Sequence, residues 1–171
     1  MNENDSMLGR LFANGSTGTV HVEDLYDTDA ADLWAALTDP ARLARWLVEV
    51  EVEADGRPEL GAELAARFTS GWNGMLRVDV CEPSRRLVVT ASSEDESTTV
   101  MEAVLTPIGA RTRLVIEERG LPIADLVFHG AGWQAHIEDL TAHLAGHDPS
   151  EWSERWRELI PAYEAAGVSP S

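Results

Sequence analysis

Residues 132–144 read GWQAHIEDLTAHL, and the apolar side chains in this stretch recur at the spacing of one helix face. Together with Leu126, about two turns upstream of Trp133, they form a stripe made of Leu126, Trp133, Ile137, Leu140 and Leu144. The pattern predicts a long helix over about 123–145. Such a helix must bury its apolar face against a second layer, which the earlier part of the chain has to supply.

That earlier part of the chain has the two-residue period of β-strands. In residues 48–53 valines alternate with glutamates, which is typical of a strand with one buried and one solvent-exposed face; the valines are Val48, Val50 and Val52. Asp55-Gly56 predicts a hairpin turn. The consecutive strands are joined by short turns, so the sheet should be antiparallel. We expect seven strands, at 19–26, 48–53, 63–68, 75–81, 87–91, 98–106 and 112–119.

Short helices are expected at two further places. Asp29 and Asp39-Pro40 are helix start signals, which predict two short helices after the first strand with a bend at Thr38–Asp39. Near the end of the chain, residues 148–151 (DPSE) predict the start of a last helix, which Pro161 should break or kink. The expected organisation is a flexible arm (1–18), one domain (19–146) and a C-terminal helical extension (147–171).

The charge balance restricts the partners. The 171 residues include 30 acidic and 13 basic ones, all of the latter arginine, for a net charge of −17. Such a chain repels phosphate backbones and anionic lipid, so we expect neither nucleic acid nor a membrane as partner. Cys81 is the only cysteine, which excludes an intramolecular disulfide. Without a signal-peptide pattern or an apolar run long enough to span a bilayer, a cytoplasmic location is expected.

The order of these elements resembles the helix-grip proteins of the START-related SRPBCC (birch-pollen-allergen-like) superfamily, and specifically its AHSA-type members, homologues of the activator of the heat-shock-protein-90 ATPase. The resemblance is carried by DLWAALTDPARLARW at 32–46, CEPSRRLVVTAS at 81–92, VLTPIGARTRLVIEERG at 104–120 and GWQAHIEDLTAHL at 132–144. It implies an α+β fold, in which a curved seven-stranded antiparallel sheet wraps the long C-terminal helix. It also implies a cavity between them. The fold hosts lipid binders, co-chaperones, cyclases and hydrolases, so it does not fix the function.

Small inward residues of the predicted strands, such as Ala66, Ala91 and Ala103, would leave space for a ligand. The alternative is closer packing with no cavity. If the cavity exists, we expect it to be lined from the long helix, the sheet and the short helices. The predicted ligand-binding residues are Trp46, Phe68, Leu76, Val78, Leu114, Ile116, Gly130, Trp133 and Ile137.

Three polar residues are weak candidates for acid–base chemistry. Glu118 shares the face of Leu114 and Ile116, so it either marks the cavity mouth or is turned to solvent at the strand end. His129 and His136 lie seven residues apart on the long helix. They either form a partly solvent-exposed row at the boundary of the buried face or line the cavity as polar groups. That spacing, about 10.5 Å along a helix, is too long for one metal ion, so no metal site is predicted. No nucleotide or metal motif is present, and no cofactor is expected.

The tryptophans outside the core suggest further roles. Trp72 adjoins a hairpin turn and could form a flap at the cavity entrance. Trp152 and Trp156, one turn apart, either dock the last helix on the body or form a surface for a protein partner or a homodimer.

Three functional hypotheses remain open. The first is non-catalytic binding of a small apolar or amphiphilic molecule in the cavity. The second, implied by the resemblance alone, is a co-chaperone-like protein that stimulates a heat-shock ATPase in a stress response. The third is a cyclase- or hydrolase-like enzyme, which requires at least two of the acid–base candidates to converge in one pocket.

Overall fold

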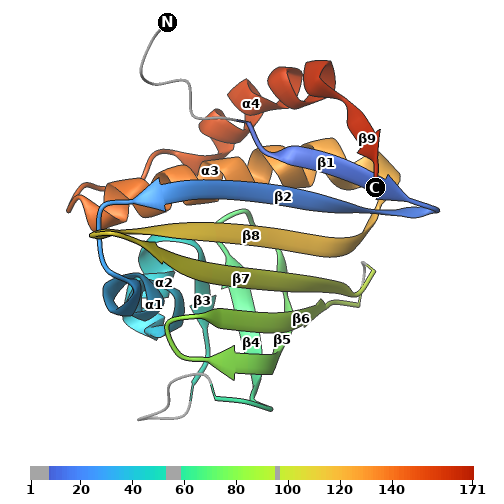
Figure 1. The fold of residues 1–171 in the computed structure, drawn as a ribbon. Helices are drawn as coiled ribbons and strands as arrows, with labels where there is room; N and C mark the ends of the chain where they lie inside the picture. Colours follow the sequence, from blue (N-terminus) through green and yellow to red (C-terminus); the bar gives the residue numbers. More distant parts are fainter. Residues whose placement is uncertain (1–7, 53–58, 95–96) are drawn as a thin grey trace, which may run out of the picture.

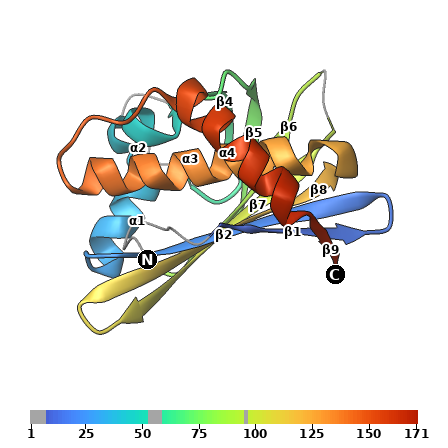
Figure 2. The ribbon, with the colours of Figure 1, turned by 90° about the horizontal axis from the view of Figure 1, so that it is seen from above.

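The computed structural model describes residues 8–52, 59–94 and 97–171, which form one large sheet with helices on one side (Figures 1 and 2). The strands in these ranges are β1 (Arg10–Asn14), β2 (Thr17–Tyr26), β3 (Val48–Val50), β4 (Glu63–Phe68), β5 (Asn73–Glu82), β6 (Arg86–Ser92), β7 (Thr99–Ile108), β8 (Arg111–Pro122) and β9 (Val168–Pro170). The helices are α1 (Ala30–Thr38), α2 (Pro40–Trp46), α3 (Leu126–Leu144) and α4 (Trp152–Ala166), with a short 3₁₀ turn at Ile123–Asp125. The predicted turn at Asp55-Gly56 lies outside the described residues.

The sheet has the order β3-β4-β5-β6-β7-β8-β2-β1-β9. The seven predicted strands form the continuous run from the β3 edge to β2, and they all pair antiparallel with one another. Two short strands are added at one edge: β1 pairs antiparallel with β2, and β9 runs parallel to β1. The α+β helix-grip architecture is therefore confirmed, with nine strands in the described residues instead of seven.

Within the stretch predicted as a flexible arm (1–18), residues 10–14 instead form the strand β1. Leu11 of this strand is buried in the core, and the backbone N–H of Gly9 donates a 2.8 Å hydrogen bond to the Tyr163 hydroxyl of α4. Since β1 also pairs with β9, both ends of the chain belong to the same sheet. The short strands lack the alternation that would have revealed them in the sequence.

The two short helices form as their caps predict. The side chain of Asp29 accepts a hydrogen bond from the backbone N–H of Asp32, and the side chain of Asp39 does the same for Ala41. Pro40 occupies the first turn of α2, where its missing N–H costs nothing. The bend between α1 and α2 therefore lies where the sequence predicts it.

The long helix α3 is buried on two sides. Its predicted stripe faces the sheet, with Trp133, Ile137 and Leu140 at most 7% exposed, while Leu144 near the helix end is only half-buried. The other side is covered by α4, which buries polar residues such as Gln134 completely. Figure 2 shows α4 crossing over α3.

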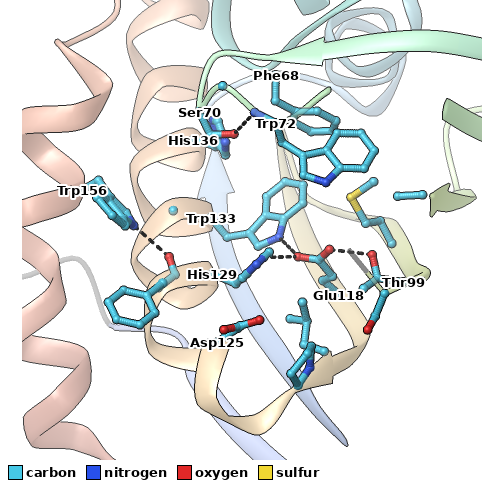
Figure 3. Close-up of a pocket in the computed structure, with 18 of the residues that line it drawn as sticks. Phe68, Ser70, Trp72, Thr99, Glu118, Asp125, His129, Trp133, His136 and Trp156 are labelled. Atoms are coloured by element: carbon cyan, nitrogen blue, oxygen red, sulfur yellow. Dashed lines mark hydrogen bonds and ion pairs between the residues drawn. The ribbon is translucent and has the colours of Figure 1, made fainter. Parts of the chain in front are cut away.

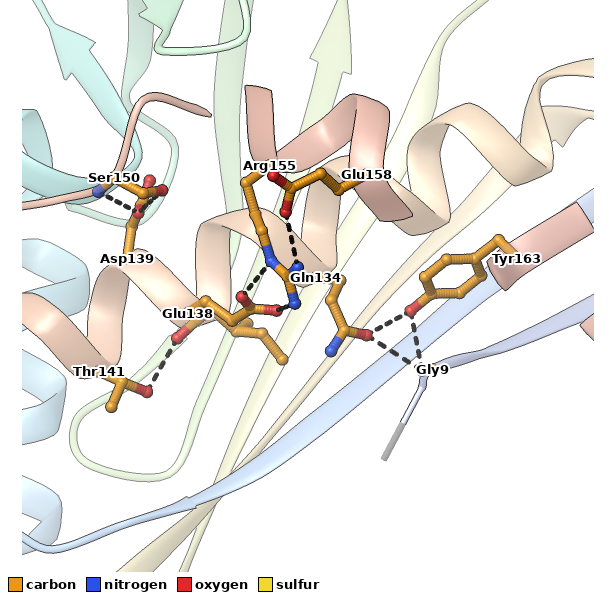
Figure 4. A network of polar contacts seen from close by, with 10 residues as sticks. Gly9, Gln134, Glu138, Asp139, Thr141, Ser150, Arg155, Glu158 and Tyr163 are labelled. Carbon is orange, nitrogen blue, oxygen red and sulfur yellow. Dashed lines mark hydrogen bonds and ion pairs between the residues drawn. The ribbon is translucent and has the colours of Figure 1, made fainter. Parts of the chain in front are cut away.

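The last helix α4 begins at Trp152, four residues later than Asp148, because Asp139 of α3 holds the preceding segment. The carboxylate of Asp139 accepts hydrogen bonds from the backbone N–H and the hydroxyl of Ser150 (Figure 4). The helix also continues through Pro161 to Ala166, so the predicted break is wrong. Pro161 is exposed, and the carbonyl one turn earlier, which loses its partner, lies on the solvent side.

Polar contacts fix α4 to α3 along its length (Figure 4). The guanidinium of Arg155 donates to both carboxylate oxygens of Glu138, at 2.7 and 3.2 Å. Farther along, the buried hydroxyl of Tyr163 donates a 2.6 Å hydrogen bond to Oε1 of Gln134. This attachment determines where the tryptophans at the start of α4 lie. None of the described helices has an apolar stretch of the length that crossing a membrane requires.

Candidate functional site

A cavity of about 570 Å³, here called the large cavity, opens between α3, the inner face of the sheet and the start of α4 (Figure 3). Its lining comes from five parts of the chain: the β4–β5 turn, strands β6 and β7, the end of β8, the first half of α3 and the start of α4. The lining residues are Phe68, Ser70, Gly71, Trp72, Ala91, Ser97, Thr99, Met101, Glu118, Leu121, Pro122, Asp125, Phe128, His129, Gly132, Trp133, His136, Trp152 and Trp156. The prediction of a space between sheet and helix thus agrees with this structure.

An unbroken series of rings, the aromatic wall, surrounds the large cavity. Trp152 stacks on Trp156 with 5.7 Å between the ring centroids, and the His136 ring lies 5.3 Å from Trp152 on its other side. His136 in turn contacts Trp133 and Phe68, at 5.6 and 6.3 Å. The edge-on Trp72–Phe68 pair, at 5.4 Å, completes the series. The wall comprises Phe68, Trp72, Trp133, His136, Trp152 and Trp156.

Glu118 lies at the floor of the large cavity and is only 6% exposed. It continues the inward row of Leu114 and Ile116 on β8, so the alternative in which the strand end turns it to solvent is wrong. Three side chains hold its carboxylate (Figure 3): those of Thr99 at 2.8 Å, His129 at 3.0 Å and Trp133 at 2.9 Å. Burial raises the pKa of Glu118, but these contacts outweigh burial and leave the pKa below its usual value.

His136 is the second candidate that faces the large cavity, and it is fully enclosed by aromatic rings. Its Nδ1 lies 3.4 Å from the Thr69 hydroxyl, a long contact. Burial lowers the pKa of His136 to about 3, only partly opposed by a backbone hydrogen bond with Trp46 and by the charge of Glu118. The imidazole is therefore neutral at neutral pH, and it behaves as a polar member of the aromatic wall.

His143, seven residues after His136 on α3, does not border the large cavity. Its Nε2 accepts a 3.1 Å hydrogen bond from Arg42 of α2. The described residues contain no group of three or more histidine, cysteine or acidic side chains that could hold a metal ion.

A second pocket of about 90 Å³, here called the small pocket, lies between the short helices α1 and α2 and the inner face of the sheet. Its lining is almost entirely apolar. Phe68, Met101 and Trp133 border both spaces, so these three side chains separate the small pocket from the large cavity.

The structure divides the nine predicted ligand-binding residues into three groups. Phe68 and Trp133 line both spaces. Three others border only the small pocket, namely Leu76, Val78 and Ile116. The remaining four border neither space: Trp46, Leu114, Gly130 and Ile137.

Physical reasons account for the misplaced residues. Trp46 is fully buried and its indole N–H donates to the backbone oxygen of Ala36, so the ring fills the core beneath α1. Leu114 and Ile137 are buried in the core between sheet and helix. Gly130 faces the opposite side of α3, where an added Cβ would lie 2.8 Å from Leu11 and 3.0 Å from the Tyr163 ring. The glycine thus permits close packing with β1 and α4 and opens no space for a ligand.

Several lining residues were not predicted as part of the site. Trp152 and Trp156 were expected to dock α4 or to meet a partner. Trp156 does dock on α3, where its indole N–H donates a hydrogen bond to the backbone oxygen of Phe128, and both rings also form one end of the aromatic wall. Trp72, which the sequence placed at the cavity entrance, lines the cavity and packs on Phe68. Thr99 and Met101 could have been found from the register, because Met101 is the cross-strand neighbour of Glu118.

Comparison with known proteins places this geometry in a family. No curated protein matches the sequence. Among solved structures, the crystal structure of CalU16 from Micromonospora echinospora is 25% identical, with a TM-score of 0.75 over 92% of this chain and 94% of that one. Protein MLL2253 from Mesorhizobium loti is also 25% identical, with a TM-score of 0.67 over 76% of this chain and 98% of that one.

A third similar structure, DynU16, is described as a putative protein in the dynemicin biosynthetic locus. It is 25% identical with a TM-score of 0.67, over 77% of this chain but only 48% of the DynU16 chain. Residues 27–145, most of the chain from the end of β2 to the end of α3, match the family described as Activator of Hsp90 ATPase homolog 1-like protein. Together with the helix-grip fold, this match shows that the chain belongs to the family of Activator of Hsp90 ATPase homolog 1-like proteins.

Proposed function

We propose that this protein binds a small apolar or amphiphilic molecule in the large cavity and holds it without changing it chemically. The observation that carries the proposal is the aromatic wall around a space of about 570 Å³. Protein interiors tolerate few voids, and this volume falls within the range of roughly 300–1,000 Å³ typical of small-molecule sites.

The lining suggests the shape of the ligand. The flat rings of Trp133 and Trp156 line the space, and they favour a planar or polycyclic body. Polar groups occur at one end, where Glu118 and His129 meet, and they would orient a single polar substituent. The small pocket behind Met101 would accept an apolar branch of a few carbon atoms. DynU16, a similar structure, is described as a putative protein in a biosynthetic locus, which is in keeping with a small-molecule role for that protein.

A second candidate, an enzyme with acid–base chemistry, is favoured by one observation. Glu118, His129 and His136 all line the large cavity, so the acid–base candidates do converge in one pocket. Glu118 lies 3.0 Å from Nδ1 of His129, an arrangement that orients the imidazole ring for proton transfer. A cyclase- or hydrolase-like reaction would use His129 as the base.

A neutral fluorescent probe, N-phenyl-1-naphthylamine, tests the binding proposal. We expect its emission to rise on mixing with the protein, with a micromolar Kd. Ala91→Phe adds a ring at the cavity wall, and it should weaken binding at least about tenfold, or roughly 1.4 kcal/mol. Ala65→Phe on the outer face of β4 is the matched control and should bind normally. Absence of binding by the wild type would overturn the proposal.

Native mass spectrometry separates the binder from the enzyme. A molecule that co-purifies with the protein is released, identified, and incubated again with fresh protein. An unchanged mass supports binding alone. A new mass that appears with the wild type and not with His129→Ala supports the enzyme.

A further inference from the structure

We infer that the large cavity selects organic cations, so that its ligand carries a protonated amine or a quaternary ammonium group beside an apolar body. This inference rests on the proposed binding function and names the chemical class of the ligand. Three independent features of the cavity carry it: the sign of its charges, the remaining acceptor capacity of Glu118, and the faces of its tryptophans.

The charges of the lining are predominantly negative. Glu118 lies on the floor and Asp125 at the rim, and none of the described lining residues is an arginine; the chain contains no lysine. His129 is 3.0 Å from Glu118, so a protonated His129 would balance only that carboxylate. Asp125 is exposed and does not cap α3 with its side chain, so it leaves the cavity with a net negative charge.

The other histidine of the lining cannot supply a positive charge. Burial among aromatic rings keeps His136 neutral at neutral pH. An anionic head group, such as a carboxylate or a phosphate, would therefore find no cationic partner other than a histidine already paired with Glu118. Like charges in a partly dehydrated site repel strongly, which disfavours fatty acids and phosphorylated ligands.

Glu118 retains the capacity to accept another hydrogen bond. Its Oε1 accepts from His129 and from Trp133, whereas the contact with Thr99 is made to Oε2. Each carboxylate oxygen has two lone pairs, so Oε2 can take one more donor. An ammonium N–H that approaches from the cavity is the donor with the largest electrostatic gain beside an ionised carboxylate.

The aromatic wall adds a second attraction for cations. Four tryptophans line the cavity: Trp72, Trp133, Trp152 and Trp156. The electron-rich face of an indole attracts cations more than other aromatic rings do, and quaternary ammonium groups are recognised in this way. The net charge of −17 acts in the same direction at longer range, because it concentrates cations and repels anions.

A charge-matched probe series tests the inference by calorimetry at 0.15 M salt. The probes share one naphthalene body: (2-naphthylmethyl)trimethylammonium, 2-naphthylmethanol and 2-naphthoate. We expect the cation to bind about tenfold or more tighter than the alcohol, as one additional cation–π or charge contact implies, and the anion to bind weakest.

Variants locate the origin of the preference. Glu118→Gln keeps the side-chain size and removes the charge, and Asp125→Asn does the same at an exposed position that cannot affect folding strongly. Each should reduce the ratio of cation to alcohol affinity about three- to tenfold, while the affinity for the alcohol stays within about twofold. Asp27→Asn changes the net charge equally at an exposed site outside the cavity, and it should leave the ratio unchanged.

The outcomes separate this inference from the proposed function. Equal binding of the three probes, or a preference for the anion, overturns the cation inference and leaves the binding function standing. A cation preference that survives in both variants overturns the assignment to Glu118 and Asp125. If none of the probes binds, the proposed function fails, and the inference fails with it.

Discussion

Replacing His136 with phenylalanine removes a titratable ring from the aromatic wall while it keeps a flat ring in place. In the folded protein the pKa of His136 is about 3, well below the 6.5 of a free histidine. As the pH falls through 6.5, His136 therefore binds a proton in the unfolded chain but stays neutral in the folded protein. The neutral His136 contributes fully to the free energy of unfolding above pH 6.5, and this stabilisation is lost progressively as the pH falls towards 3.

The expected size follows from these two values. One pKa unit corresponds to about 1.36 kcal/mol, so between pH 7.5 and 5.5 the wild type should lose roughly 1–2 kcal/mol of unfolding free energy through His136. His136→Phe has no proton to bind and avoids this loss. Removal of the 3.4 Å contact with Thr69 shifts the stability of the variant by an amount that does not depend on pH.

Urea unfolding followed by tryptophan fluorescence at pH 7.5, 6.5 and 5.5 gives the required free energies. All three values lie above the sequence pI of about 4.5, near which solubility should fall. His147→Phe, at an exposed position after α3, is the control and should track the wild type. If the difference between wild type and His136→Phe is the same at all three pH values, the reasoning about a neutral, enclosed His136 is refuted.

Three further predictions concern packing and charge. Gly130→Ala should lower the unfolding free energy by about 1–2 kcal/mol. The added Cβ would lie only 2.8 Å from Leu11, and this clash outweighs the gain of about 1 kcal/mol in helix propensity. An unchanged or raised melting temperature would contradict this prediction. Leu140→Asp should abolish the cooperative melting transition, since it buries an unpaired charge at a fully buried position, and a soluble variant with normal melting would disprove the placement of α3. Fluorescence anisotropy should detect no binding of duplex DNA at physiological salt, and a micromolar, salt-sensitive complex would overturn the charge argument.

Local patterns were sufficient to predict most of the fold. Alternation and turn signals identified the seven strands from β3 to β2, and the caps at Asp29 and Asp39 located the two short helices. The edge strands β1 and β9 escaped detection because each has at most five residues and is held by contacts between the two ends of the chain. Such contacts depend on tertiary docking, which a local window of sequence does not contain.

The site was harder to predict than the fold for the same reason. Glu118 continues the inward row of Leu114 and Ile116, but the sequence left open whether the strand end turns it to solvent. Its inward position depends on contacts with Thr99, His129 and Trp133, which lie on other elements or later in the chain. Gly130 was misassigned because the sequence does not reveal that α4 covers the second side of α3. The same docking turns Trp152 and Trp156 into cavity lining, although their spacing predicted only a common helix face.

The indole N–H signals of the six tryptophans provide the most direct test of the large cavity as a binding site. In ¹H–¹⁵N spectra, assigned with single Trp→Phe variants, we titrate the protein with N-phenyl-1-naphthylamine. We predict that the signals of the four cavity tryptophans shift together and saturate at one equivalent, while those of the core residues Trp34 and Trp46 remain in place. Shifts confined to Trp34 and Trp46, or no shift of Trp133 at saturating probe, would contradict a ligand site between α3, α4 and the sheet.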